Sequence, residues 1–209
     1  MEQNKTRFYL IRHGETDWNK GGRYQGCTNI QLNDAGREQA RLLGERFKFL
    51  PLDVVYVSPL DRAVATAAPL AAAHGLTPIQ DAHFREINFG EWEGMTSEEI
   101  SAKYGKEFDE FLKNPEEMPF SGEGSFKNVE KRIAKGFEKI LEGKNGKSIA
   151  VVTHGGIIRI AVKYLLGIEG QWFNKTWIDN TSITLVEIHK NYNLLRVLND
   201  SSHINKGIF

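Results

Sequence analysis

Residues 7–14 read Arg7-Phe8-Tyr9-Leu10-Ile11-Arg12-His13-Gly14, and this short run sets the architecture. Its aromatic and β-branched residues predict a buried strand that ends at the Arg-His-Gly sequence. The strand therefore carries Arg12 and His13 at its C-terminal end. The same arrangement recurs at 54–57, before Ser58-Pro59, and at 149–152, before Thr153-His154-Gly155-Gly156.

Helical patterns lie between these strands. Asn33 is an N-cap residue type, and it precedes apolar residues at helical spacing: Ala40, Leu43, Phe47 and Leu50. The alanine-rich stretch 63–73 predicts a buried helix that Pro69 interrupts late. Three more helices are indicated by a Thr96/Glu99 capping box, by a stripe at Val129, Ile133, Phe137 and Leu141, and by the apolar run after Gly155-Gly156.

The alternation of strands and helices predicts an α/β fold. Residues 183–188 and 194–198 complete the series as closing strands. We expect one domain over 1–209, a three-layer sandwich whose mostly parallel central sheet is flanked by helices, with a helical and loop insertion at about 94–124. Ligands of such sheets bind beyond the carboxyl ends of the strands. This rule predicts that three pairs of residues meet at one edge: Arg12 with His13, Ser58 with Arg62, and Thr153 with His154.

Composition excludes several classes of partner. The 209 residues include 27 basic and 27 acidic side chains, so no net charge favours nucleic acid or an anionic membrane. The single cysteine, Cys27, cannot form an intrachain disulfide, which favours a reducing compartment. No signal-peptide pattern or membrane-spanning run is present, so we expect a cytoplasmic protein.

The residues at the predicted sheet edge suit phosphoryl transfer. A neutral imidazole such as His13 is a competent nucleophile for phosphorus when its other ring nitrogen is held as a donor. Arg12, Arg62 and His154 would supply cations or donors to the phosphoryl oxygens, and no metal or cofactor is then required. We expect Glu86 to protonate the leaving oxygen, since neighbouring negative charge raises the pKa of a carboxylic acid.

Four motifs occur in an order that is similar to a known family. They are Leu10-Ile11-Arg12-His13-Gly14-Glu15-Thr16 with Trp18-Asn19, Ser58-Pro59-Leu60-Asp61-Arg62-Ala63 with Thr66-Ala67, residues 85–94 (REINFGEWEG), and Val152-Thr153-His154-Gly155-Gly156. The chain resembles the histidine phosphatase superfamily, also called phosphoglycerate mutase-like, and within it the branch of alpha-ribazole phosphatases and broad-specificity phosphatases.

The resemblance implies a role for each matching residue. His13 would carry the phosphoryl group, Arg12, Arg62 and His154 would line the phosphate pocket, and Glu86 would act first as acid and then as base. It also places four softer positions at the phosphate or substrate: Asn19, Gln25, Gly26 and Gly155.

Other conspicuous residues have simpler interpretations. Gly21-Gly22 is not followed by the Lys-Ser or Lys-Thr of a nucleotide-binding loop, and Cys27 is expected to be an inert small residue. We assign no role to the four remaining histidines: His74, His83, His189 and His203. Core positions are favoured over substrate contacts for seven aromatic residues, with the alternative that some of them roof the pocket: Trp92, Phe108, Phe111, Phe120, Trp172, Phe173 and Trp177.

The leading hypothesis is hydrolysis of a small phosphorylated metabolite to release inorganic phosphate. A cofactor-dependent phosphoglycerate mutase is the alternative, but Glu86 is followed by Ile87-Asn88-Phe89-Gly90 instead of the Arg-His-Tyr run of mutases. A phosphate-binding protein without catalysis is a third hypothesis. Phosphoserine, 3-phosphoglycerate, sugar phosphates and alpha-ribazole phosphate all stay open as substrates. The sequence does not fix the oligomeric state, and a homodimer is one option.

Overall fold

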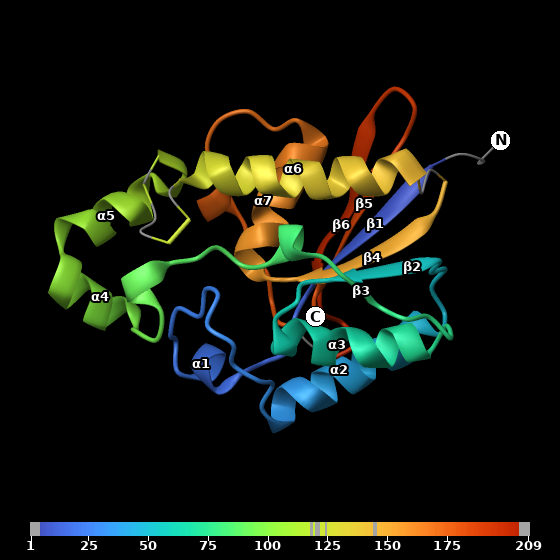
Figure 1. Ribbon diagram of the computed structural model, residues 1–209, viewed down its shortest axis with the longest axis horizontal. Coiled ribbons are helices and arrows are strands. Elements are labelled where there is room, and N and C mark those ends of the chain that lie inside the picture. The colour runs from blue at the N-terminus through green and yellow to red at the C-terminus, as the bar shows by residue number, and fades with distance from the viewer. Residues whose placement is uncertain (1–4, 118, 120–121, 124, 144–145, 205–209) are drawn as a thin grey trace.

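A mixed six-stranded sheet runs through the middle of the computed structural model, which describes residues 5–117, 119, 122–123, 125–143 and 146–204 (Figure 1). The order of strands is β3-β2-β4-β1-β5-β6. The first four in this order are parallel to one another, and β5 pairs antiparallel with both of its neighbours, β1 and β6. Their bounds are β1 Thr6–Arg12, β2 Val54–Val57, β3 Ile79–Gln80, β4 Ser148–Thr153, β5 Ile183–Ile188 and β6 Asn193–Asp200. The predicted α/β sandwich with a mostly parallel sheet is confirmed.

Helices cover both faces of this sheet (Figure 1). On one face lie α2 (Asp34–Phe47) and α3 (Asp61–Ala72), and on the other lie α6 (Phe126–Gly143) and α7 (Gly155–Leu166). The remaining helices are α1 (Asp17–Lys20), α4 (Ser97–Tyr104) and α5 (Lys106–Lys113). No helix in the described part of the chain is both long enough and apolar enough to cross a membrane.

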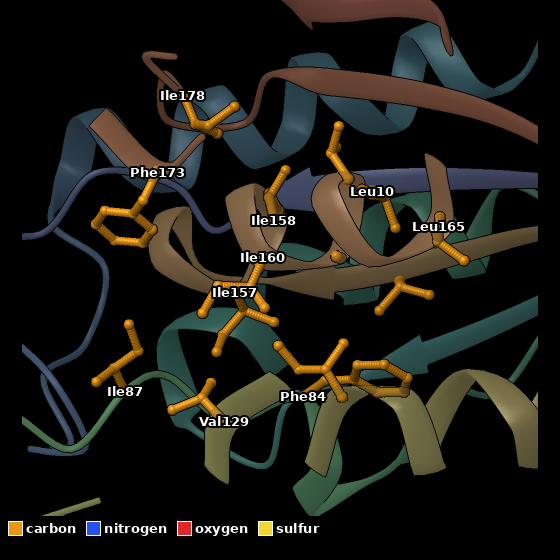
Figure 2. Close-up of a cluster of buried hydrophobic side chains, with 14 of the residues drawn as sticks. Leu10, Phe84, Ile87, Val129, Ile157, Ile158, Ile160, Leu165, Phe173 and Ile178 are labelled. Carbon is orange, nitrogen blue, oxygen red and sulfur yellow. The ribbon is translucent and has the colours of Figure 1, made fainter. Parts of the chain in front are cut away.

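Alternation along β1 explains the two apolar cores. Phe8 and Leu10 point to the α6 and α7 side, whereas Tyr9 and Ile11 point to the α2 and α3 side, as the two-residue period of a strand requires. Figure 2 shows Leu10 beside α7, near Ile158 and Leu165. Burial of each large side chain contributes roughly 1.5–3 kcal/mol, so this double layer fixes β1 firmly.

Several local expectations hold and others do not. Asn33 caps α2, and Thr96 and Glu99 form both bonds of a capping box at α4. The stripe on α6 drifts: Val129, Ile133 and Phe137 are fully buried, but Leu141 is only partly buried and Ile140 takes its place in the core. A helix has 3.6 residues per turn, so a strict four-residue spacing rotates off the apolar face.

Pro69 does not interrupt α3, contrary to the sequence-based expectation. The helix continues through it to Ala72. A proline loses one backbone hydrogen bond, but here its ring lies against Gly44 of α2, where an added Cβ would be 2.8 Å from the Pro69 Cβ. Pro69 therefore lies in the close contact between α2 and α3.

Candidate active site

Two neighbouring strands bring the histidines together. β1 and β4 pair with Arg12 opposite Thr153, so the residues that follow, His13 and His154, lie side by side beyond the same sheet edge. Their ring centroids are 5.2 Å apart. The N–H of His13 donates to the carbonyl of Thr153 at 2.9 Å, which fixes the point where the chain leaves the strand.

Gly14 lets the chain pass close to α2 just after His13. A Cβ at Gly14 would lie 2.5 Å from the carbonyl oxygen of Gly36. The N–H of Gly14 donates to Thr66 Oγ1 of α3 at 2.9 Å. Any side chain here would push α2 away from the strand end, so the position of His13 depends on glycine at 14.

His13 is oriented by one short contact. Its Nδ1 lies 2.7 Å from the carbonyl oxygen of Gly14, and because a carbonyl only accepts, Nδ1 carries the proton and Nε2 keeps a lone pair. Burial, followed by the charges of Arg62 and Arg12, holds the pKa of His13 well below its ordinary value. The imidazole is therefore neutral near pH 7, which is the form that can attack.

Arg12 and Arg62 have part of each guanidinium fixed and part available. Arg12 Nη1 donates to the carbonyl of Ile178 at 2.7 Å, and Arg62 Nη1 and Nη2 donate to the carbonyls of Thr28 (2.8 Å) and Gly26 (2.7 Å). Within the described residues, the buried Nε of each arginine has no acceptor. Burial lowers the pKa of both, to about 10 for Arg12, so both stay charged near pH 7. An anion between them would satisfy these donors.

His154 is fully buried behind His13. Its Nε2 lies 2.7 Å from Ser58 Oγ, and its buried Nδ1 has no partner among the residues described. Burial and the charges of Arg62, His13 and Arg12 hold its pKa well below the ordinary value. If the Ser58 hydroxyl donates to Nε2, the proton of the neutral ring is on Nδ1, which becomes a further hydrogen-bond donor. A bound phosphate dianion would favour the protonated, cationic form of the His154 ring.

Glu86 lies next to the start of α7. Its Oε1 accepts from the N–H of Ile87 at 3.0 Å, and its Oε2 from the N–H of Gly156 at 3.4 Å. Burial raises its pKa, although these two N–H groups and the charges of Arg62 and Arg12 oppose the rise. The protonated form therefore persists to higher pH than in an exposed glutamate, as a general acid requires.

These groups line one cavity of about 510 Å³. Its wall includes Arg12, His13, Arg62 and Glu86, and also all four softer positions from the sequence: Asn19, Gln25, Gly26 and Gly155. The structure thus brings the predicted residues together, with His154 directly behind the wall. The histidines at 74, 83, 189 and 203 are described too, and they do not line this cavity.

Asn19, Gln25 and Gly26 each have a structural feature that suits them to the cavity wall. Asn19 Oδ1 accepts from the Thr16 N–H, and Gln25 Oε1 accepts from Thr16 Oγ1, so each side chain keeps its amide NH₂ as a donor. Gly26 has φ +53°, and a Cβ there would lie 1.9 Å from Glu93 Oε1. Only glycine allows its carbonyl to approach Arg62.

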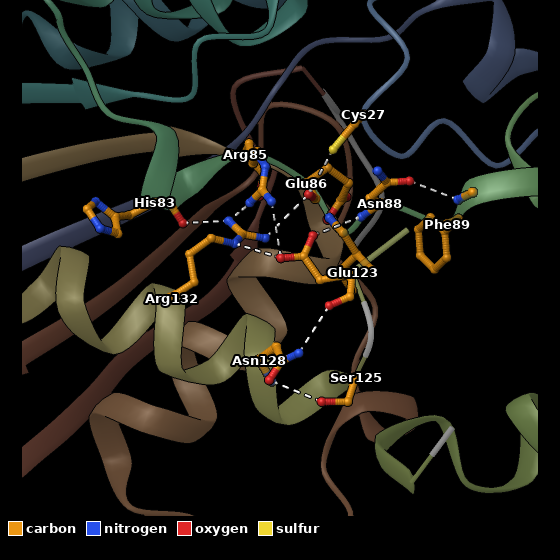
Figure 3. Close-up of polar contacts among 12 residues, drawn as sticks. Cys27, His83, Arg85, Glu86, Asn88, Phe89, Glu123, Ser125, Asn128 and Arg132 are labelled. Carbon is orange, nitrogen blue, oxygen red and sulfur yellow. Dashed lines mark hydrogen bonds and ion pairs between the residues drawn. The ribbon is translucent and has the colours of Figure 1, made fainter. Parts of the chain in front are cut away.

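The segment that carries Glu86 is held by Arg132 of α6 (Figure 3). Arg132 Nη1 donates to the carbonyls of His83 (2.7 Å) and Arg85 (2.9 Å), and its Nη2 lies 3.4 Å from the carbonyl of Glu86. Its Nε donates to Glu123 Oε1 at 3.1 Å. Sequence reasoning missed this residue, because nothing local to Arg132 indicates a contact across more than forty residues.

The cavity wall also includes residues that the sequence did not single out. They include Tyr24, Arg159, Asn180 and Ile178. Arg159 could have been found, because it follows Gly155 at a spacing of four residues and so shares its helix face. Asn180 could not have been found from a local pattern. Its Nδ2 donates to the carbonyl of His13 at 2.9 Å, although the two residues are far apart in the sequence.

The aromatic residues divide between the core and the cavity wall, and the alternative that some of them roof the pocket applies to three. Trp92 and Phe108 are buried core residues, but Phe111 and Phe173 are both buried and part of the cavity wall. Trp177 is 69 % exposed and also lines the cavity. Phe120 lies outside the described residues. An apolar side chain at a cavity wall has the same sequence signature as one in a core, so periodicity cannot separate them.

Comparisons with known proteins agree on one family. The family model described as "Histidine phosphatase superfamily (branch 1)" matches residues 8–201. Phosphoserine phosphatase 1 from Hydrogenobacter thermophilus is 32 % identical over 198 residues, which cover 95 % of this chain and 94 % of that protein.

Solved structures agree with the sequence relatives. A phosphoserine phosphatase variant from Entamoeba histolytica in complex with phosphoserine superposes with TM-score 0.86 at 32 % identity, covering 96 % of this chain and 100 % of that one. A putative alpha-ribazole-5'-P phosphatase from Escherichia coli superposes with TM-score 0.84 at 25 % identity, covering 94 % and 97 %.

Proposed function

The chain belongs to the histidine phosphatase superfamily, and on this premise we propose that His13 takes the phosphoryl group from a small phosphomonoester and passes it to water. The enzyme is a phosphoric monoester hydrolase that works through a phosphohistidine. The observation that carries the assignment of His13 is its neutral, oriented ring, beside two arginines whose buried Nε atoms lack acceptors within the described chain.

In the first step, the phosphate oxygens lie among Arg12, Arg62 and His154. His13 Nε2 attacks phosphorus in line, and the bond from phosphorus to the ester oxygen breaks. The proton of the Glu86 carboxylic acid moves to that oxygen, so the leaving group departs as a neutral alcohol. The arginines and His154 balance the charge that spreads over the phosphoryl oxygens.

In the second step, the Glu86 carboxylate accepts a proton from water. The resulting hydroxide-like oxygen attacks phosphorus, the N–P bond breaks, and inorganic phosphate leaves. His13 returns to its neutral form and Glu86 to its acid form. The same carboxyl thus serves both steps, in opposite protonation states.

A panel of phosphomonoesters tests this function. Phosphate release is measured for phosphoserine, 3-phosphoglycerate, sugar phosphates and alpha-ribazole phosphate, with EDTA present. Phosphoserine comes first because a relative binds it. Turnover of 3-phosphoglycerate to 2-phosphoglycerate faster than phosphate release, in the presence of 2,3-bisphosphoglycerate, would instead establish a mutase.

The covalent intermediate gives the sharper test. Substrate labelled with ³²P, quenched in alkali after milliseconds, should leave label on the protein that acid removes, because phosphohistidine is acid-labile. His13→Ala should carry no label and show no turnover. His74→Gln is the matched control, since the His74 ring hydrogen-bonds to the carbonyl of Phe47 and does not line the cavity, so this variant should be labelled normally. Equal labelling of His13→Ala and the wild-type protein would refute the assignment.

We further propose a cytoplasmic location, which the single cysteine supports. The proposed partners are a small phosphorylated metabolite as substrate and inorganic phosphate as product. A homodimer stays a prediction, and sedimentation of the purified protein would test it.

A further inference from the structure

Arg159 extends the site beyond the phosphate. It lies on α7, one turn after Gly155, and lines the same cavity. Its guanidinium carbon lies 4.9 Å from the ring centroid of Phe173 and 5.9 Å from that of Trp177. Figure 2 shows Phe173 beside the first turns of α7, so the ring is part of the packed structure that supports Arg159. Two aromatic faces therefore hold the guanidinium in place.

The guanidinium of Arg159 differs from the other cations of the wall. Arg12 and Arg62 donate to backbone carbonyls, and Arg23 donates to the carbonyl of Gly94 and to Glu99. Arg159 makes no hydrogen bond or ion pair to any residue that the structure describes, and its buried Nε is without an acceptor. A partly buried guanidinium with unsatisfied donors is costly, and a ligand anion would remove that cost.

Arg159 lies on α7 three residues after Gly156, whose N–H donates to Glu86 Oε2, so the two residues share a face of the helix. Among the described groups, the charge of Glu86 acts most strongly on Arg159, raising its pKa against the larger lowering by burial. The charges that act on His13 are those of Arg62 and Arg12. The same face of α7 therefore carries the contact to Glu86 and the Arg159 side chain, and this placement suits an anion on the alcohol half of the substrate.

We propose that Arg159 binds a carboxylate on the leaving alcohol, so that the enzyme prefers phosphate esters of short hydroxy acids. This inference rests on the proposed function, because the phosphate site must first place the ester oxygen near Glu86. A carboxylate suits one planar guanidinium, which binds both oxygens with parallel hydrogen bonds. A second phosphate would need more positive charge, but Arg23, the other cation of the outer wall, already pairs with Glu99.

Matched substrate pairs test the proposal. Phosphoserine is compared with phosphoethanolamine, and 3-phosphoglycerate with glycerol 3-phosphate; each pair differs in the carboxylate. We expect kcat/KM to be about 100-fold higher for the carboxylated member of each pair in the wild-type enzyme, the size expected for a desolvated ion pair. In Arg159→Met this preference should fall to a few-fold, mainly through KM. Arg159→Lys should retain part of it.

Controls separate specificity from folding and from general activity. In Arg159→Met, kcat/KM should fall much more for phosphoserine than for phosphoethanolamine, because only phosphoserine carries the carboxylate that the guanidinium binds. Arg196→Met, which removes an exposed arginine of β6, should keep the full preference. Thermal melting followed by circular dichroism verifies that each variant is folded.

Three outcomes would overturn the inference. They are equal kcat/KM within each pair for the wild-type enzyme, loss of both members alike in folded Arg159→Met, and a stronger preference for bisphosphorylated substrates. In each case, labelling of His13 would continue, so the proposed function would stand. Failure of the proposed function is distinguished by the absence of His13-dependent hydrolysis of every substrate.

Discussion

The proton on Glu86 is the most sensitive feature of the proposed reaction. His13 must be neutral and Glu86 protonated in the first step. The pKa of His13 is lowered and that of Glu86 is raised, so the pH range of neutral His13 and the pH range of protonated Glu86 shift toward each other. Without these opposite shifts, the required pair of protonation states would be rare near pH 7.

Glu86→Gln is therefore expected to act selectively. Because glutamine cannot donate the proton, kcat/KM for phosphoserine should fall by about 10²–10⁴-fold. For p-nitrophenyl phosphate, whose leaving group needs no proton, kcat/KM should fall less than tenfold. In the wild-type enzyme kcat/KM for phosphoserine decreases as the pH rises through the raised pKa of Glu86, and this limb should be absent in the variant.

Glu91→Gln is the matched control, since Glu91 is an exposed neighbour that accepts from Tyr104 Oη at 2.6 Å. It should keep both the rate and the pH profile. An equal loss on both substrates in Glu86→Gln would show that Glu86 does not act as the acid.

At the scale of single residues, the sequence predicted the residues at strand ends and, through their motifs, Arg62 and Glu86, but it missed Arg132 and Arg159. Arg12, His13 and His154 follow apolar strands, so topology alone brings them together. Arg159 and Arg132 sit within helices, where an arginine usually marks a solvated face. The contacts of Arg132 arise from long-range packing that no local pattern records, whereas the four-residue spacing of Arg159 after Gly155 was a local signal that went unused.

The elements matter because they position these side chains. α7 begins at Gly155, and a Cβ at Gly156 would lie 2.8 Å from Glu86 Oε1 and 3.0 Å from Ile87 Cδ1. Glycine at 156 therefore lets the carboxyl lie against the start of the helix. The glycine pair between β4 and α7 therefore makes room for the Glu86 carboxyl as well as for the bound phosphate.

Gly156→Ala should displace the Glu86 carboxyl with little loss of stability. The carboxyl is the end of a flexible side chain and can move, so we expect kcat to fall about tenfold and the free energy of unfolding to change by less than about 1 kcal/mol. Gly143→Ala at the end of α6 is the control, since a Cβ there meets nothing within 4 Å. Steady-state kinetics and urea unfolding of both variants provide the check, and unchanged kcat in Gly156→Ala would contradict this account.

Arg132 of α6 is expected to be a positioning residue for Glu86. Arg132→Met removes its donors to three carbonyls and leaves Glu123 with fewer partners, so the free energy of unfolding should fall by about 2 kcal/mol. The high-pH limb of kcat/KM should also shift, because the Glu86 segment is no longer fixed. Arg132→Lys should restore part of both effects.

The adjacent exposed residue gives the comparison: Lys131→Met should change neither stability nor the pH profile. A folded Arg132→Met with normal kcat and an unshifted profile would limit Arg132 to a purely structural role.

The sequence predicts the order of the helices and strands, but it predicts their bounds less well. The strand at 183–188 and the cap at Asn33 match the prediction, because apolar alternation and capping chemistry are local. β3 has only two residues, too few to give a pattern, and it exists because it pairs with β2. Pro69 stays helical for a reason that lies on another helix.

In the whole molecule, one apolar core extends from the sheet into the segment that follows residue 94. Trp92, Phe108 and Phe111 belong to the same buried cluster as Phe8 and Leu10. We therefore expect the described part of the chain to unfold as one unit, consistent with the proposed single domain.

Urea unfolding followed by two probes checks this expectation. Far-ultraviolet circular dichroism reports the helices and sheet, and fluorescence reports tryptophans that include buried Trp92. The two midpoints should coincide. An earlier fluorescence transition would show that the segment around α4 and α5 is an independent unit.

The pairing of β1 with β4 also links folding quality to activity. A slip of one residue would shift the strands by about 3.3 Å and turn every side chain to the opposite face. His13 and His154 would then separate, and the arginines would lose their common anion. Molecules with this shifted register should thus be inactive instead of weakly active. The specific activity of a preparation would then be proportional to its fraction of correctly paired molecules.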